Sequence, residues 1–321
     1  MYPRIFQIVL ILFSTLLFSS CKKESPTDPP TSGTDLTELR GAYLGQTPPG
    51  NVPVRFAPNY LFKANGSWWW QSSPVFSPDG NEMYFVKYFT GAESHEIWFT
   101  KSVNGKWTEP QKAPFSTSTF DSSPFFSQSN DTLYFFSMRS GGFIFRTTRT
   151  STGWSNPVAL NIPLPQNYVG GQSFSITKNR TVYFGMMINN TSDPQAMYRS
   201  ADIYRSKFNN GQYAQPENIG SSINTDLGEG VGYVDPDERF MIYSSSKLGG
   251  IGLHDMYLSN RNQDGTWNNP IHLEPPINST SEDSSPLVTH DGKYFFFITE
   301  KSGDNGYTPY WVDSNFLDAL K

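Results

Sequence analysis

A motif recurs along the chain from residue 72 onward, and this repeat constrains the fold more than any other feature of the sequence. Its first copy is Ser72-Ser73-Pro74-Val75-Phe76-Ser77-Pro78-Asp79-Gly80, followed closely by Met83-Tyr84-Phe85. Five equivalent aromatic residues, separated by 50, 49, 59 and 54 positions, mark the copies: Phe85, Phe135, Phe184, Tyr243 and Phe297. A period of this length indicates a fold assembled from repeated supersecondary units.

Each copy is predicted to form four short strands. Asp79-Gly80, or an Asn-containing substitute in later copies, suits the positive φ of a tight hairpin turn. Aromatic and β-branched residues flank the turn, as strands prefer, and a third strand follows around Trp98, Phe145, Tyr204, Tyr257 and Trp311. The fourth strand carries an aromatic residue, two further residues and a proline, which belongs on an edge because it cannot donate to a ladder. Repeated four-stranded units of this kind predict a β-propeller.

The last copy lacks a fourth strand, because the sequence ends soon after Trp311. A matching segment lies near the other end, where residues 51–58 resemble residues 110–114. With this segment included, five prolines mark fourth strands, at positions 53, 110, 157, 216 and 270. We therefore expect an all-β propeller of five blades closed by the N-terminal segment, which removes an open sheet edge. Six blades would follow if residues 41–70 held more than one strand.

The first twenty residues have the features of an export signal. Arg4 supplies a positive charge, and the mostly apolar stretch 5–18 is too short for a comfortable membrane span. Small residues then precede Cys21, the only cysteine, in a pattern that resembles the lipobox of bacterial lipoproteins. We expect residues 1–20 to be a lipoprotein signal peptide and Cys21 to be lipidated. The alternative is an ordinary signal peptide with an incidental cysteine.

Residues 21–40 are predicted to be the lipidated cysteine and a flexible tether, because this Pro-rich polar stretch has almost nothing to bury. Its composition is similar to that of lipoproteins from Bacteroidetes-type bacteria. Residues 41–321 are then expected to form a single propeller domain. The predicted location is the bacterial cell envelope, anchored to the outer membrane on its periplasmic or its surface side.

The first copy of the motif also points to a family. Residues 73–80 with the aromatic strand after them resemble the WD40-like repeat of TolB-type propellers, and residues 43–58 are similar to the opening of secreted propeller lipoproteins. The resemblance extends to about residue 313, although the second copy has Gln128-Ser129-Asn130 in place of Pro-Asp-Gly. It implies a binding protein of the periplasm or cell surface, usually for protein partners, and it names no catalytic residues.

Composition and motifs exclude several functions. The formal net charge of -5 offers no broad basic surface, so no nucleic-acid partner is expected. The chain contains no Gly-x-Ser-x-Gly elbow, no His-Glu-x-x-His and no Cys-x-x-Cys. The four histidines, at 95, 254, 272 and 290, show no ligand spacing, and we expect them to be exposed. No metal site, cofactor or catalytic residue is predicted.

Polar residues recur at one level just before the inner strand of each blade, where a ring could rim the mouth of the central channel: Gln71, Asp121, Gln172, Glu229 and Asp283. Converging acids at such a mouth could bind a cation or a cationic side chain. The alternative is that each carboxylate hydrogen-bonds backbone in its own blade-to-blade crossover. Glu96, Asp202 and Asp255, which repeat before the third strand, are interpreted as turn caps.

Three tryptophans precede this ring. Trp68 and Trp70 share one face of a strand and could stack on a sugar or peptide at the mouth. Alternatively, they wedge between the first and last blades and seal the ring. The predicted function is a lipid-anchored binding or scaffold module for a protein or glycan. The alternative is a carbohydrate-active hydrolase that uses the acidic ring, since glycoside hydrolysis needs two opposed carboxylates.

Overall fold

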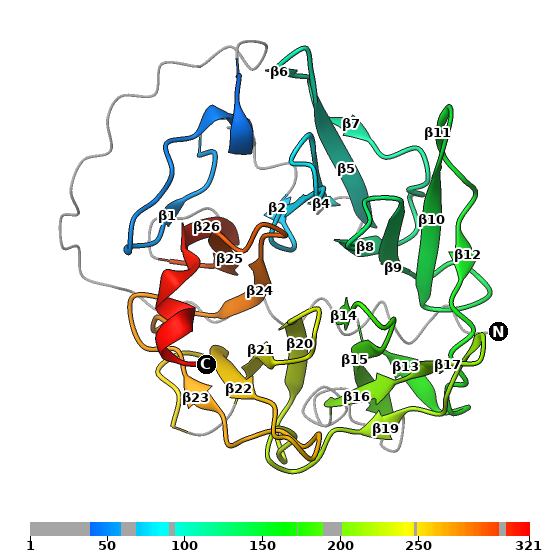
Figure 1. Ribbon diagram of the computed structural model, residues 1–321, viewed down its shortest axis with the longest axis vertical. Helices are drawn as coiled ribbons and strands as arrows, with labels where there is room; N and C mark the ends of the chain where they lie inside the picture. The colour runs from blue at the N-terminus through cyan, green and yellow to red at the C-terminus, as the bar shows by residue number, and fades with distance from the viewer. Residues whose placement is uncertain are drawn as a thin grey trace.

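The computed structural model describes residues 39–58, 69–89, 94–171, 173–188, 201–246, 249–301 and 306–321. Antiparallel sheets form five blades around a central axis, which Figure 1 shows end-on. Helical structure within these residues is limited to two short 3-10 segments, η3 (Ala42–Gly45) and η4 (Ser314–Ala319). No helix in this part of the chain is long and apolar enough to cross a membrane.

Each blade draws its strands from one stretch of sequence, except the last. Blade 1 contains β2 (Trp69–Trp70), β3 (Val75–Phe76), β4 (Glu82–Phe89), β5 (Ser94–Val103), β6 (Lys106–Trp107) and β7 (Gln111–Lys112). Blade 2 contains β8 (Asp121–Phe126), β9 (Thr132–Ser137), β10 (Ile144–Thr150), β11 (Gly153–Trp154) and β12 (Val158–Ala159). Blade 3 contains β13 (Tyr168–Gly170), β14 (Phe174–Ile176), β15 (Val182–Ile188), β16 (Asp202–Ser206), the hairpin β17 (Phe208–Asn209) with β18 (Gln212–Tyr213), and β19 (Glu217–Asn218).

Blade 4 is formed by β20 (Glu229–Val234), β21 (Phe240–Ser245), β22 (Asp255–Asn260) and β23 (Ile271–His272). Blade 5 combines β24 (Asp283–Val288), β25 (Tyr294–Thr299) and β26 (Thr308–Asp313) with β1 (Val54–Arg55), which comes from the other end of the chain. The inner strands β8, β14, β20 and β24 surround the axis, as Figure 1 shows. The blade count predicted from the repeat is confirmed, since β1 joins blade 5 and β2 joins blade 1.

The inner strands carry an irregularity that comes from the repeat itself. The ladders β8–β9 and β24–β25 shift register between the serine pair and the following apolar pair. Ser123 and Ser285 take positive φ values of 50° and 53° at these bulges, a conformation that costs a non-glycine residue energy. The Ser-Ser-Pro part of the motif therefore marks a bulge as well as the start of a strand.

A buried hydroxyl connects the third strand to the fourth in four blades. Each of these side chains donates a hydrogen bond of 2.6–2.7 Å to a backbone carbonyl eight or nine residues later: Thr100, Thr147, Ser206 and Ser259. All four residues are fully buried. A buried hydroxyl without a partner would be costly, so these bonds fix the path of the chain between the two outer strands.

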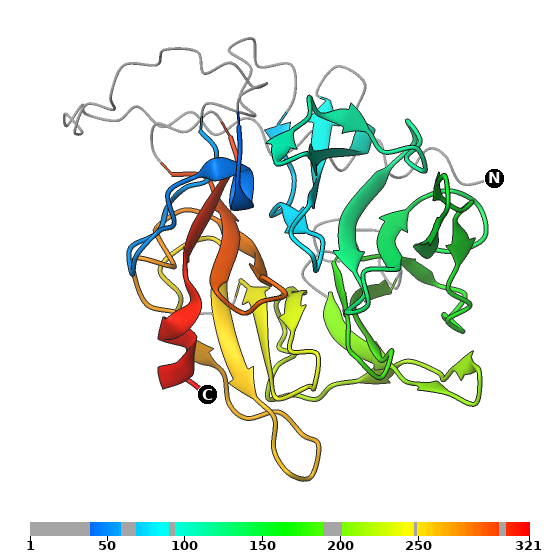
Figure 2. The same cartoon turned by 45° about the horizontal axis from the view of Figure 1, so that its top comes forward.

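The fourth strands are short and share one backbone feature. In every blade the residue after the two-residue strand donates its N–H to a carbonyl in the first half of the third strand: Phe56, Ala113, Leu160, Ile219 and Leu273. In blade 5, Val54 pairs with Trp311 and Arg55 with Tyr310, and the N–H of Phe56 reaches the carbonyl of Pro309 at 2.8 Å. Figure 2 shows this closing strand, in blue, beside the red C-terminal strand. The predicted ring closure by residues 51–58 is confirmed.

Aromatic packing completes the closure. Phe56 is fully buried, with ring centroids 5.1 Å from Phe296, 5.3 Å from Trp311 and 5.9 Å from Phe76. Tyr43, from η3, packs edge-on against Phe76 at 4.8 Å. The joint between the two chain ends is thus a large aromatic cluster as well as a backbone ladder, and aromatic pairs of this geometry stabilise beyond their buried area.

Candidate functional site

Three of the predicted ring residues, Asp121, Glu229 and Asp283, occupy equivalent places, as the first residues of their inner strands. Each carboxylate accepts a hydrogen bond from the backbone N–H four residues earlier, at 2.5, 2.9 and 2.6 Å respectively. The hydroxyl of that earlier residue also donates to the carboxylate: Thr117, Thr225 and Ser279. Each acid therefore closes its own blade-to-blade crossover.

Further partners of these acids differ between blades. Arg139 donates to both oxygens of Asp121 at 2.9 Å. The hydroxyl of Ser245 donates to Glu229 at 2.8 Å. Asp283 keeps one oxygen without a hydrogen bond of normal geometry to a described residue. Burial raises the pKa of Glu229 and of Asp283, and the hydrogen bonds that they accept offset only part of this rise.

These contacts correct the expectation that the acids rim an open channel mouth. The exposed fractions of Asp121, Glu229 and Asp283 are 0%, 2% and 0%. Their oxygens face the crossover behind the strand, because the crossover N–H groups and hydroxyls satisfy buried carboxylates there. The structure thus matches the alternative considered for the sequence, in which each acid hydrogen-bonds its own crossover.

The other predicted site residues differ in burial, and some of them lie outside the described residues. Trp70 is 1% exposed and belongs to the buried cluster that also contains Phe296 and Trp311 of blade 5, so it takes the sealing role and presents no face to a ligand. Gln71 is half-buried at the start of blade 1. Trp68, Gln172 and Cys21 lie outside the described residues. Whether the channel mouth binds a ligand stays a prediction for the remaining positions.

The acids before the third strand have separate roles. Asp255 caps the preceding loop, because it accepts hydrogen bonds from the N–H groups of Ile251 and Gly252. Glu96 instead pairs with Lys112 at 2.7 Å, and Asp202 accepts from Asn218 at 2.9 Å. The turn-cap interpretation therefore holds for one of the three.

The expectation that the histidines are exposed fails, because His254, His272 and His290 are half-buried and His95 is buried. This residue is 3% exposed and stacks on Phe120, with ring centroids 3.9 Å apart. Burial lowers the pKa of His95 to about 4. The ring is therefore a neutral part of the packing between blades 1 and 2 at neutral pH.

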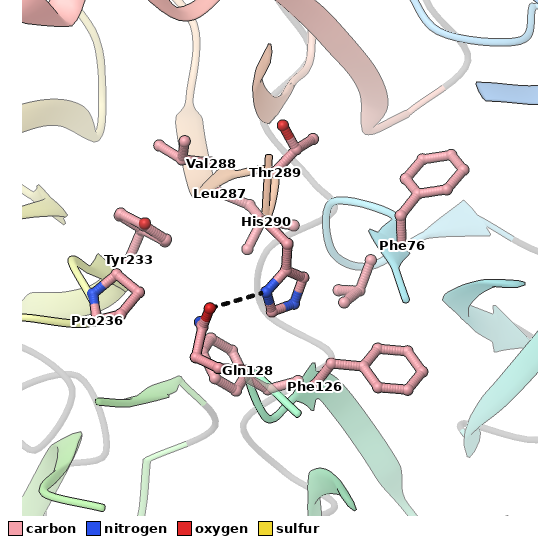
Figure 3. Close-up of a pocket in the computed structure, with 11 residues that line it drawn as sticks. Phe76, Phe126, Gln128, Tyr233, Pro236, Leu287, Val288, Thr289 and His290 are labelled. Carbon is pink, nitrogen blue, oxygen red and sulfur yellow. Dashed lines mark hydrogen bonds between the residues drawn. The ribbon is translucent and has the colours of Figure 1, made fainter. Parts of the chain in front are cut away.

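The opposite end of the channel, formed by the strand-one to strand-two turns, is narrow. Gln128 and His290 approach across it, with Oε1 and Nδ1 3.5 Å apart (Figure 3). Apolar side chains that include Tyr233 and Leu287 line the space behind them, which is about 30 Å³. This is room for water, and it is too small for a sugar ring or a large side chain.

A larger pocket, of about 370 Å³, lies between blades 2 and 3. Its walls come from the loop before β10, from the crossover between the blades and from the blade 3 strands, and the lining residues include Phe143, Leu160, Ile162, Leu164 and Tyr168. The rings of Phe143 and Tyr168 meet edge-on at 4.6 Å. Pockets of this size and apolar character are typical of ligand sites.

The pocket lies where the repeat breaks down, a signal that the sequence interpretation missed. Crossovers with a buried acid carry Thr or Ser four positions before it, whereas the crossover between blades 2 and 3 has Ile162-Pro163-Leu164-Pro165. Ile162 and Leu164 are half-buried and face the pocket.

The described residues also include no three His, Cys, Asp or Glu side chains placed to hold a metal ion. No protein-family model matches the chain, and no curated protein matches it. Solved structures with a similar arrangement include an oligogalacturonate lyase in complex with manganese, at 14% identity and a TM-score of 0.44 over 84% of this chain and 71% of that one.

Two further solved structures are similar. A GH62 hydrolase in complex with xylotriose has 10% identity and a TM-score of 0.49 over 78% of this chain and 92% of that one. An endo-arabinase from Bacteroides thetaiotaomicron has 12% identity and a TM-score of 0.46 over 76% of this chain and 94% of that one. At these identities the likeness concerns the fold alone.

Proposed function

We propose that this chain is a binding propeller of the bacterial cell envelope, which captures a protein partner by enclosing an apolar side chain of that partner in the pocket between blades 2 and 3. The observation that supports this is the pocket itself, about 370 Å³ with Phe143, Ile162, Leu164 and Tyr168 in its walls. Buried apolar anchors supply most of the energy in protein recognition. The mechanism is rigid display on a closed ring.

The lining favours a peptide over a glycan. Of the residues that line the pocket, only Asn161 and Tyr168 carry a side chain that can hydrogen-bond. A sugar brings several hydroxyls, and burying them without partners is unfavourable. A leucine or phenylalanine side chain makes no such demand.

A random dodecapeptide library panned on the purified protein tests this role. We expect the selected peptides to share a large apolar residue. Leu164→Asp should weaken their binding at least about tenfold, because a carboxylate then faces the apolar group. Val103→Asp, at a site 46% exposed in blade 1, is the control and should leave binding unchanged. No selection, or selection that Leu164→Asp does not affect, would contradict the proposal.

Hydrolysis of glycosidic bonds is not part of the proposal. That chemistry needs two opposed carboxylates at an open pocket, whereas Asp121, Glu229 and Asp283 are buried and hydrogen-bonded within their own blades. The binding role is the function that these contacts support.

The anchor is the second part of the proposal. Cys21, in its lipobox-like context, is the acylation site that would hold the propeller at the outer membrane. Mass spectrometry of the mature N-terminus should find a diacylated or triacylated Cys21, and Cys21→Ser should move the protein out of the membrane fraction. A free thiol on Cys21 in the mature protein would rule the anchor out.

A further inference from the structure

A chain of polar side chains joins blades 4 and 5 on the face where the crossovers lie. The hydroxyl of Ser246 lies 2.9 Å from Nε2 of His254. Nδ1 of the same imidazole lies 3.9 Å from Oε1 of Glu282. The hydroxyl of Tyr307 donates to the other oxygen of Glu282 at 2.8 Å. The order of these groups is hydroxyl, imidazole, carboxylate and phenol.

The backbone holds these groups in place. His254 and Glu282 form a parallel bridge, and the N–H of Asp283 donates to the carbonyl of His254 at 2.9 Å. Close approach of the two loops depends on Gly252, where a Cβ would lie 2.0 Å from the carbonyl oxygen of Ser281. Ser246 follows directly after β21, so its position is set by the end of a ladder.

The carboxylate determines how the imidazole can act. Nδ1 of His254 is shielded from solvent and makes no hydrogen bond to a described residue, and the carboxylate of Glu282 lies on that side. With the proton on Nδ1, Nε2 keeps its lone pair and accepts the proton of the Ser246 hydroxyl. The 3.9 Å separation is longer than a hydrogen bond, as catalytic contacts often are without substrate. A nucleophile, a base and an orienting group in this order are the signature of covalent catalysis.

We propose that Ser246 is an activated nucleophile that takes an acyl group from small esters, an activity that goes beyond the binding role and does not depend on it. Oγ forms a bond to the ester carbonyl carbon while its proton passes to Nε2 of His254. The carbon–oxygen bond to the leaving alcohol then breaks, and that alcohol takes the proton from Nε2. Water releases the acid by the same two steps and restores the hydroxyl. Ser246 and His254 are the catalytic residues, and Glu282 is a positioning residue.

Neither residue of the pair is enclosed in the core. Ser246 is half-buried, and the side chain of His254 is 37% exposed. We therefore expect an external ester to reach the hydroxyl. A structural role alone would need the hydroxyl–imidazole contact but would give the serine no reactivity.

Labelling with a fluorophosphonate probe, followed by peptide mass spectrometry, tests the proposal on the full-length chain. We expect the label on Ser246 and slow release of p-nitrophenol from p-nitrophenyl acetate. Ser246→Ala should abolish both, while Ser118→Ala, at an exposed serine on another crossover of the same face, should change neither. His254→Asn should slow labelling about 100-fold or more, the range for loss of a general base.

Substitutions of Glu282 provide a second test of the proposal. Glu282→Gln should slow labelling with an unchanged melting temperature, and Glu282→Asp should restore part of the rate, since a carboxylate again faces Nδ1. Labelling of Ser246 at the wild-type rate in His254→Asn would overturn the proposal, as would no labelling of a folded wild-type protein. Neither result bears on peptide binding at Leu164, so the two proposals fail separately.

Discussion

Blades 4 and 5 use the same hydrogen bonds and differ in where their fourth strand comes from. In blade 4, β23 follows β22 in sequence, and Leu273 donates to Met256 at 3.0 Å. In blade 5, β1 arrives from the opposite end of the chain, and Phe56 donates to Pro309 at 2.8 Å. Loop-closure entropy grows by about 0.6 kcal/mol for each doubling of the loop, so the second join costs about 2–3 kcal/mol more.

Side-chain packing offsets that cost. Leu273 enters a cluster rich in aliphatic residues, with Ile242, Met256 and Leu258, whereas Phe56 enters a cluster with Phe76, Trp107, Phe296 and Trp311. Burying a large aromatic side chain removes more apolar area from water than burying a leucine does. Two joints with the same backbone hydrogen bonds can therefore differ in the entropy cost of closing them. The side chain that follows the ladder, Phe56 or Leu273, provides packing energy that matches this cost.

Removing the borrowed strand should have the largest effect. Deletion of residues 39–58 leaves β26 with an unpaired edge and empties the aromatic cluster, so we expect aggregation and no cooperative melting transition. Deletion of residues 22–38, most of the predicted tether, should shift the melting temperature by no more than about 2 °C. Thermal melts and size-exclusion chromatography compare the two. Equal stability of both truncations would show that β1 does not hold the ring together.

Single substitutions at the equivalent positions should have the next largest effects. Phe56→Ala should lower the free energy of unfolding by about 3–5 kcal/mol and Leu273→Ala by about 2–5 kcal/mol, because each leaves a cavity in a buried cluster. Only Phe56→Ala should also release the N-terminal segment, so trypsin should then cut at Arg55 in the native protein. Cleavage at Arg55 in Leu273→Ala, at the same rate, would mean that the two joints are not independent.

The smallest effect should come from the equivalent buried acids. The carboxylate of Glu229 accepts hydrogen bonds from Thr225 and Ser245, so Glu229→Gln places an amide N–H₂ against donors and should cost about 1–3 kcal/mol at pH 7. Asp283 has an oxygen without a normal hydrogen bond, so Asp283→Asn should cost less than Glu229→Gln. Denaturant unfolding at pH 7 and at pH 4 measures both.

The pH dependence of these acids has a definite sign. Burial raises the pKa of each carboxyl in the folded state, so the folded protein holds these protons more tightly than the unfolded chain does. Their contribution to stability is therefore full below the unfolded pKa and is lost as the pH rises through the folded pKa. Asp283→Asn removes one such component, so its loss of stability relative to wild type should be smaller at pH 7 than at pH 4. An unchanged difference from wild type at both pH values would contradict this assignment.

The blades and their closure could be predicted because equivalent residues in a repeat mark where each structural unit begins and ends. The spacing of Phe85, Phe135, Phe184, Tyr243 and Phe297 gave the units, and the similarity of residues 51–58 to a fourth strand gave the closure. The repeat does not determine which way a side chain at the end of a strand points. Asp121 could equally have faced the channel, and only Thr117, four residues earlier, indicates that it turns toward the crossover.

Sites formed between two blades could not be predicted from a single sequence. Ser246, His254 and Glu282 meet because neighbouring blades bring their loops together, and their spacing along the chain corresponds to no motif. The pocket beside Leu164 could have been suspected from the sequence, because it occupies the crossover that departs from the others. Departures from a repeat deserve the same scrutiny as the repeat itself.

Ring closure also determines how the molecule responds to mechanical load. If Cys21 is acylated, tension from the membrane enters the propeller at residues 39–58, where Leu39 and Arg40 contact β6 before the chain reaches β1. That strand is held by two residue pairs and by the N–H of Phe56, whereas β25 and β26 share six pairs. We therefore expect residues 39–58, including β1, to detach before the strands within a blade separate. A force spectrometer that pulls the protein from its two ends should record this detachment as the first event.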